Sequence, residues 1–201
     1  MHPWCRSTTI AYLDDNVLEG MKRRARDVSS GKAELISSEI SYEDWEYQQM
    51  RKIDEEGALI RYVGPDAYKL NDKLRNDMAL TNDEQKWIKS LDDALDKLPA
   101  YEGIVRRSVE FYFEEDLQDY IDFHQVGSVV NYKQYISSTS GEVYNNNNAQ
   151  VQFTIKSKSG RNNNLLNVNE KEVIFKRNAE FMVLDVREDN GTFKIALEEI
   201  I

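Results

Sequence analysis

The sequence predicts an α+β fold, with helices packed on a mainly antiparallel sheet. Apolar residues recur with helical spacing before Pro99, whereas short β-branched or aromatic segments, punctuated by Gly and Asn, follow it. Helices and strands in separate blocks of a chain indicate this class. We therefore expect a helical lobe over about residues 36–98 and a β-rich core over about residues 99–201.

Amphipathic helices account for the first block. Segments 41–64 and 65–80 predict two or three helices, and a further one begins at Thr81. Thr81 is its N-cap, Glu84 three residues later completes a capping box, and Pro99 stops it. Its apolar side chains fall on one face: Trp87, Ile88, Leu91, Leu95 and Leu98.

Short strands account for the second block. The segments with a strand pattern are 103–113, 132–140, 149–158, 171–177, 179–189 and 192–200. A helix over about residues 114–124 interrupts them, and we expect a structural role for His124 on it. Asn-rich stretches at 145–148 and 160–164 predict loops, and the basic, then Ser/Gly-rich segment 21–31 predicts a linker.

The composition excludes several classes of function. The chain has 201 residues, enough for one domain or a compact domain with a short appendage, and 40% of them are hydrophobic. It has no apolar run of about 18 residues to span a membrane, and no signal-peptide core. Cys5 is the single cysteine, which excludes an internal disulfide, and the net charge of −10 disfavours nucleic acid and anionic membrane as partners.

Three motifs in the second block carry the candidate chemistry: an arginine pair in "YEGIVRRS", the run "ISSTS", and two glutamates in "NEKEV". Residues two apart on a strand share a face, so the two carboxylates would lie side by side and repel each other. Each motif alone is commonplace on strand edges and turns. The residues concerned are Arg106, Arg107, Ser138, Thr139, Ser140, Glu170 and Glu172.

In this order and at these distances, the motifs resemble the arginine–serine–glutamate class of mono-ADP-ribosyltransferases, which includes bacterial actin-modifying toxins. "GIVRR" is similar to the family's Gly-x-Val-aromatic-Arg strand, and "NEKEVIFKRNAEF" to its Glu-x-Glu strand and following turn. The resemblance covers about residues 36–201. It implies a helical lobe packed on two mainly antiparallel sheets, a split β-sandwich, with NAD in the cleft and no metal.

The resemblance also implies a role for each motif. The family breaks the bond between nicotinamide and ribose in NAD through a cationic transition state, which a nearby anion stabilises. Glu172 would hold the 2′-hydroxyl of that ribose, and Ser138 would orient Glu172 by a hydrogen bond. Arg107 would bind the diphosphate. Glu170 would position an acceptor arginine and take its proton, since family members with glutamate at this position generally modify arginine.

Further contacts with NAD are implied for Arg106, Thr139, Ser140, Tyr62 and Asn71. The family usually has an aromatic residue before its catalytic arginine, where this chain has Arg106. We prefer Arg107 as the catalytic arginine, and a shift of one residue, to Arg106, remains the alternative.

Three aromatic positions depart from the family pattern. A second aromatic expected at Ala67 is displaced to Tyr68. The aromatic expected three residues before Glu170 is replaced by Asn167, which leaves the acceptor protein open. Tyr144 is a candidate to stack on nicotinamide, with loop packing as its alternative.

The N-terminal stretch lies outside this pattern. "MHPWCRSTTIAYLDD" resembles the C-terminal end of phage Mu-F-like head-morphogenesis domains. On this interpretation residues 1–30 are a head-protein remnant and linker, and residues 31–201 are the transferase domain. His2 and Cys5 lie three apart, but with no second pair nearby they do not predict a zinc site.

The leading hypothesis is an NAD-dependent arginine mono-ADP-ribosyltransferase, acting as a toxin or effector on a protein in the cytoplasm of a target or host cell. An NAD glycohydrolase, with water as acceptor, and a non-catalytic phage structural or interaction protein are the alternatives. The delivery route, by a phage particle or a specialised secretion system, and the existence of an immunity protein stay open.

Overall fold

The computed structural model describes residues 22–27, 31–143, 148–163 and 171–201. The chain divides into two compact units, Met1–Asp54 and Glu55–Ile201, which are described separately. The zinc and head-protein interpretations concern residues before 22, so they lie outside the described residues. The same holds for Tyr144, Asn167 and Glu170.

In the first unit, a two-stranded hairpin precedes a long helix. Strands β1 (Lys22–Arg26) and β2 (Ala33–Ser37) pair antiparallel, and helix α2 (Tyr42–Tyr62) follows. Lys52 on the helix donates to the buried Asp27 at 2.8 Å, which ties helix to hairpin. Among the described residues, none of the helices is long and apolar enough to cross a membrane.

This hairpin corrects the expected linker. The boundary expected between residues 30 and 31 falls inside the hairpin, and residues 22–26 form a strand. The run of basic residues carries no alternation of apolar and polar side chains, so its strand depends on pairing with β2, which a local pattern does not reveal.

Three helical segments begin the second unit: the end of α2, α3 (Asp66–Arg75) and α4 (Asn82–Lys97). Thr81 caps α4 by accepting the Glu84 N–H at 3.2 Å, and the Glu84 carboxylate accepts the Thr81 N–H at 2.8 Å. The predicted capping box is thus confirmed. The buried side chains of α4 are Trp87, Ile88, Leu91, Ala94 and Leu95.

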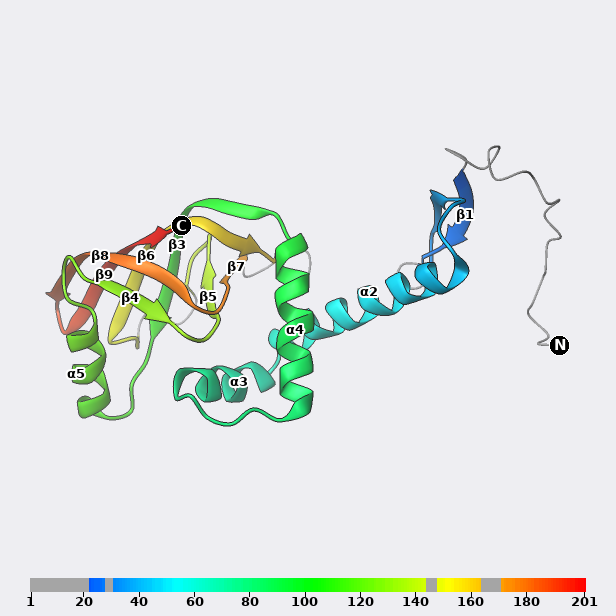
Figure 1. Cartoon of the computed structure of the whole chain (residues 1–201). Helices are drawn as coiled ribbons and strands as arrows, with labels where there is room; N and C mark the ends of the chain where they lie inside the picture. Colours follow the sequence, from blue (N-terminus) through cyan, green and yellow to red (C-terminus); the bar gives the residue numbers. More distant parts are fainter. Residues whose placement is uncertain (1–21, 28–30, 144–147, 164–170) are drawn as a thin grey trace, which may run out of the picture. The chain divides into compact units, whose positions relative to one another are not determined.

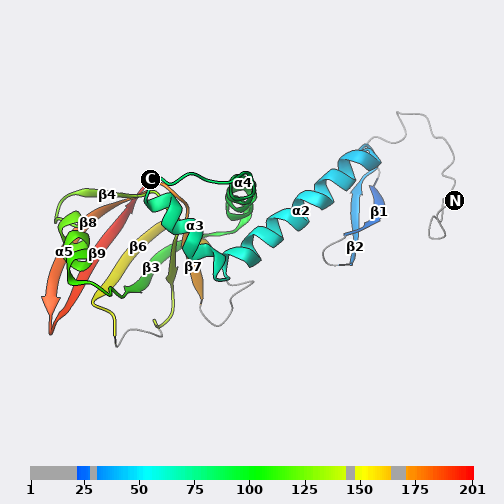
Figure 2. The ribbon, with the colours of Figure 1, turned by 90° about the horizontal axis from the view of Figure 1, so that it is seen from below.

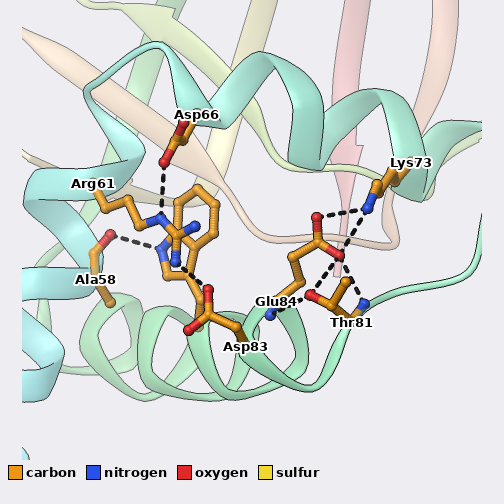
Figure 3. Close-up of polar contacts among 8 residues, drawn as sticks. Ala58, Arg61, Asp66, Lys73, Thr81, Asp83 and Glu84 are labelled. Atoms are coloured by element: carbon orange, nitrogen blue, oxygen red, sulfur yellow. Dashed lines mark hydrogen bonds and ion pairs between the residues drawn. The ribbon is translucent and has the colours of Figure 1, made fainter.

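Trp87 and Arg61 connect α4 to α2, and Figure 3 shows Arg61 beside Ala58, Asp66 and Asp83. The Trp87 indole N–H donates to the Ala58 carbonyl at 3.0 Å, and the Arg61 guanidinium lies 4.1 Å from the centre of the same ring. Arg61 also donates to Asp66 at 3.1 Å and to Asp83 at 2.8 Å, so one guanidinium joins three helices.

A second link joins α3 to α4. Lys73 donates to Glu84 at 2.7 Å, and Figure 3 shows this contact beside the capping box. The hydrogen bond from Lys73, followed by that from the Thr81 N–H, lowers the pKa of Glu84 to about 2. These links fix the helices that carry Tyr62, at the end of α2, and Asn71 on α3.

The remaining strands form a seven-stranded sheet in the order β3-β5-β7-β6-β9-β8-β4, and β3 also pairs with β6. The strands are β3 (Ala100–Val109), β4 (Val129–Tyr132), β5 (Ile136–Thr139), β6 (Val151–Asn162), β7 (Glu172–Phe175), β8 (Ala179–Asp189) and β9 (Thr192–Ile200). Among the described strands, every pairing is antiparallel except that of β6 with β9. The strands expected in two sheets are therefore joined into one sheet through β6, which pairs with β3, β7 and β9.

Helices cover opposite ends of this sheet. Figures 1 and 2 show α4 next to β5 and β7, and α5 (Glu114–Phe123) at the other end, beside β4, β8 and β9. The predicted α+β architecture is confirmed, and in the second unit helices precede the strands, with one helix among them.

Two hydrophobic clusters meet at β7. Val173 and Phe175 belong to the cluster inside the sheet sandwich, whereas Ile174 belongs to the cluster under the helices α2, α3 and α4. Because successive residues point to opposite faces, β7 is covered on both sides. All residues of β7 are buried, including the polar Glu172.

The stretch 160–164, expected as a loop, is in part a strand. β6 continues through Asn162 because its last two residues pair with β7. Gly160 fits inside it for a steric reason: a Cβ there would lie 2.7 Å from both Ser157 Oγ and Val173 Cγ1. This glycine marks close packing and not a turn.

Candidate active site

Glu172 is a buried carboxylate at the start of β7, with 7% of its surface exposed. Asn163, which follows β6, is fully buried and donates from its amide Nδ2 to Glu172 Oε2 at 2.9 Å. On β5, Thr139 pairs directly with Glu172. Burying a carboxylate is costly unless donors bind it, so the contact with Asn163 is central to this site.

The segment before Glu172 departs from strand geometry. Glu170 lies outside the described residues, and Lys171 is exposed with a φ of 46°. Because β7 begins only at Glu172, the strand alternation that predicts two carboxylates on one face does not extend through Lys171. Non-glycine residues in the left-handed region are rare overall, and those that occur are concentrated at functional sites.

The Ser-Thr-Ser motif and Asn163 hold the backbone around Glu172. The carbonyls of residues 171–173 each accept a hydrogen bond. Ser140 donates to the Lys171 carbonyl from its N–H at 3.0 Å and from its hydroxyl at 3.2 Å. The Asn163 N–H donates to the Glu172 carbonyl at 2.9 Å. The Ser138 hydroxyl donates to the Val173 carbonyl at 2.8 Å. Ser138, expected to bind the carboxylate, thus contacts the carbonyl of the next residue.

The two candidate arginines lie on opposite faces of β3. Arg106 is on the exposed face and pairs with Thr139. Arg107 lies on the same face as the buried Val105, is half-buried, and donates from Nη1 to the Ser137 carbonyl at 2.6 Å. Alternation along the strand therefore separates the pair, and Arg107 is the one turned toward the interior.

Tyr62 and Asn71 connect the helices to Arg107 through Ser137. The Tyr62 hydroxyl accepts from Asn71 Nδ2 at 3.3 Å and from the Ser137 hydroxyl at 3.4 Å. Asn71 Oδ1 accepts the Tyr135 N–H at 3.1 Å. Sequence positions far apart are thus joined in one hydrogen-bonded chain that ends at Arg107.

The charges of Arg107 and Glu172 both affect the pKa of the Tyr62 phenol. Burial raises the pKa of Tyr62 above its usual value, while the hydrogen bonds from Ser137 and Asn71 oppose this rise. The Arg107 charge also lowers the pKa of Tyr62, and the Glu172 charge raises it.

Three other residues singled out in the sequence have other surroundings. Tyr68 is 80% exposed, and Ala67 packs with the helical cluster. His124 is buried, with Nδ1 at 2.7 Å from the Tyr120 carbonyl and Nε2 against the Tyr132 hydroxyl. Among the described residues, no group of three or more His, Cys, Asp or Glu side chains could hold a metal ion.

Sequence reasoning missed Ser137 and Asn163. Ser137 is the first of the doubled serines in "ISSTS", and strand alternation places it on the face opposite to Ser138. Asn163 lies in the Asn-rich stretch expected as a loop. No local sequence pattern marks it, because its place beside Glu172 depends on the pairing of β6 with β7.

Sequence comparisons identify related proteins. A family model described as ADP-ribosyltransferase exoenzyme matches residues 38–201. The chain is 29% identical over 151 residues to the NAD(+)–protein-arginine ADP-ribosyltransferase Tre1 of Serratia proteamaculans (strain 568). It is 29% identical over 152 residues to Mav of Mycobacterium avium (strain 104), provisionally named an NAD(+)–arginine ADP-ribosyltransferase. Each match covers 73% of this chain but 32% of Tre1 and 18% of Mav, so the chain spans about a third or less of these relatives.

Solved structures share the fold. Exoenzyme S from Pseudomonas aeruginosa, in complex with human 14-3-3 protein beta and bound to carba-NAD, has a TM-score of 0.62 at 20% identity over 73% of each chain. The C3 exoenzyme of Clostridium limosum has a TM-score of 0.61 at 16% identity, over 74% of this chain and 85% of that one. With its matched sequence and this shared fold, the chain belongs to the ADP-ribosyltransferase exoenzyme family.

Proposed function

We propose that the protein is an NAD-dependent mono-ADP-ribosyltransferase that transfers ADP-ribose from NAD to an arginine of a target protein. The observation that carries this proposal is the buried Glu172, held by side-chain and backbone hydrogen bonds and paired with β5, the strand whose Ser137 carbonyl accepts from Arg107. Family membership supports the chemistry, and the arginine ADP-ribosyltransferase Tre1 supports arginine as the acceptor.

In this proposal Arg107 binds the diphosphate of NAD with its planar guanidinium. Its half-buried position and its contact with the Ser137 carbonyl favour it over the exposed Arg106, which serves as a lesser contact. Tyr62 and Asn71 support this arginine through Ser137.

Glu172 then acts on the ribose. It accepts a hydrogen bond from the 2′-hydroxyl of the nicotinamide ribose and stabilises the positive charge that develops there. The bond between C1′ and the nicotinamide nitrogen breaks, and its electron pair leaves with nicotinamide. A nitrogen of the acceptor arginine bonds to C1′, and its proton passes to Glu170. Thr139, Ser138 and Ser140 line and hold this part of the site.

The place of action and the partners follow from the same proposal. One structural relative is the type III effector XopAI from Xanthomonas axonopodis pv. citri, with a TM-score of 0.62 at 20% identity over 79% of this chain and 69% of that one. We propose that this chain likewise acts as a toxin or effector, on a protein in the cytoplasm of a target or host cell. An immunity protein as a partner and carriage by a phage particle are further proposals, the second based on the resemblance of residues 1–15 to a phage head protein.

The test uses biotin-labelled NAD and a cell lysate with the wild type, Glu172→Gln, Glu170→Gln and Glu188→Gln. Glu188 is exposed on β8 and serves as the matched control. We expect labelled proteins with the wild type and Glu188→Gln, and none with the other two. Label in the Glu170→Gln sample would contradict an arginine acceptor served by Glu170.

Nicotinamide release, measured in the same reactions, distinguishes the alternatives. Release by the wild type without labelled protein would replace the transferase with an NAD glycohydrolase. Absence of release would leave a non-catalytic protein of this fold.

A further inference from the structure

We propose that Asn163 is a positioning residue that holds the Glu172 carboxylate in the orientation needed to bind the ribose. The inference rests on the proposed function, in which Glu172 contacts that ribose. Asn163 follows the last residue of β6, and its amide Nδ2 donates to Glu172 Oε2 at 2.9 Å.

Burial makes this contact strong. Asn163 has 0% of its surface exposed and Glu172 has 7%, so water competes little for either group. A hydrogen bond to an ionised carboxylate in such surroundings is stronger than one between neutral groups, and it restricts rotation of the carboxylate. The amide thus restricts the orientation of the carboxylate at Oε2.

The surroundings of the amide oxygen, Asn163 Oδ1, indicate a role beyond folding. Within the described part of the chain, Asn163 Oδ1 is buried and has no hydrogen-bond partner. Flipping the amide would not help, because it would bring Oδ1 against the Glu172 carboxylate. A buried acceptor without a donor is unfavourable, and an apolar side chain of similar size would avoid it. The presence of asparagine at this position is therefore explained by its side-chain N–H group, which donates to Glu172.

The backbone N–H of Asn163 has a separate role that does not depend on the side chain. Its N–H donates to the Glu172 carbonyl at 2.9 Å and extends the pairing of β6 with β7. Substitutions of the side chain leave this bond in place, so they test the amide alone.

The experiment compares Asn163→Leu and Asn163→Asp with the wild type in steady-state nicotinamide release. Leucine removes the donor without adding charge, and aspartate keeps the shape but repels Glu172. We expect kcat to fall in both variants, more in Asn163→Asp, with KM for NAD nearly unchanged, because NAD is still bound by Arg107. A role in shape alone predicts the opposite order, with the isosteric aspartate closer to the wild type.

Asn131 on β4 provides the control. Its Nδ2 also donates to a glutamate, Glu180 Oε1, at 3.4 Å, but on the exposed surface of β4 and β8. Asn131→Leu and Asn131→Asp should keep the kcat of the wild type. Thermal melting of every variant ensures that kcat is compared only where the proteins are folded.

The outcomes separate the two proposals. If the wild type releases no nicotinamide, the proposed function fails. If the wild type is active and a folded Asn163→Leu matches its kcat, the positioning role is wrong while the function stands. A rise in KM with unchanged kcat would also overturn it, by making Asn163 a residue for NAD affinity.

Discussion

At the scale of single residues, the site depends on which face of a strand each side chain occupies. Arg106 and Arg107 are adjacent in the sequence, yet alternation directs them to opposite faces of β3. Arg107 shares its face with the buried Val105 and reaches the Ser137 carbonyl. A guanidinium in this position has further N–H donors with which to bind a diphosphate.

This difference predicts unequal effects of replacing the two arginines by lysine. Arg107→Lys loses the planar set of donors, and the loss of one charge-assisted hydrogen bond, about 1.5–3 kcal/mol, raises KM for NAD about tenfold or more. Arg106→Lys, on the exposed face, should have a clearly smaller effect. Steady-state nicotinamide release gives both values. A larger effect at Arg106 would shift the catalytic assignment by one residue.

The sequence predicted these residues only as types in an order. Arg107, Ser138 and Glu172 could be proposed because the order and spacing of their motifs resemble those of a known family. Asn163 and Ser137 could not. The contact of Asn163 with Glu172, nine residues later, depends on the pairing of β6 with β7, and the contact of Ser137 with Tyr62 joins residues 75 apart in the chain. The hydroxyl of Ser138 also has a partner, the Val173 carbonyl, that no motif specifies.

At the scale of elements, β5 and the start of β7 form one unit around Glu172. Ser138 lies on β5 and Ser140 directly after it, and their hydroxyls donate to the carbonyls of Val173, on β7, and Lys171, directly before it. The spacing of the serines therefore matches the spacing of the carbonyls that flank the carboxylate. These side-chain hydrogen bonds hold β7 in addition to its backbone pairing with β5.

Ser138→Ala should lower the free energy of unfolding by about 1 kcal/mol, because the Val173 carbonyl loses its hydroxyl donor. Ser140→Ala should cost less, since the N–H of residue 140 still donates to the Lys171 carbonyl. Urea denaturation measures both. Equal losses in the two variants would show that the hydroxyl bonds do not hold β7 in the way described.

Elements with strong local signals could be predicted, and those that depend on pairing could not. The helix after Thr81 has both a capping box and an apolar face, and its bounds agree with the structure. Strand β1 is a run of basic residues and forms by pairing with β2. β6 extends through Asn162 because β7 lies beside it, although the Gly and Asn residues there are typical of a loop.

At the scale of the whole molecule, the two hydrophobic clusters of the second unit meet at β7, so the helices and the sheet sandwich both fix the strand that begins with Glu172. The described members of these clusters lie at Ala58 or beyond. The family match begins at residue 38, after the hairpin of β1 and β2. The parts of the chain that build the site therefore lie within residues 38–201.

A protein of residues 38–201 should accordingly fold and release nicotinamide from NAD as the full chain does. It keeps Ser41, whose hydroxyl accepts the Asp44 N–H at 3.0 Å and caps α2. Of the part of the chain that the structure describes, it loses the hairpin and its contacts with that helix. We expect kcat and KM equal to those of the full chain, and a Tm within a few degrees of it, because neither cluster loses a described member. Glu172→Gln in the same shortened protein is the inactive control. A folded but inactive protein would mean that residues before 38 contribute to the site, and the transferase domain would then have to include the hairpin.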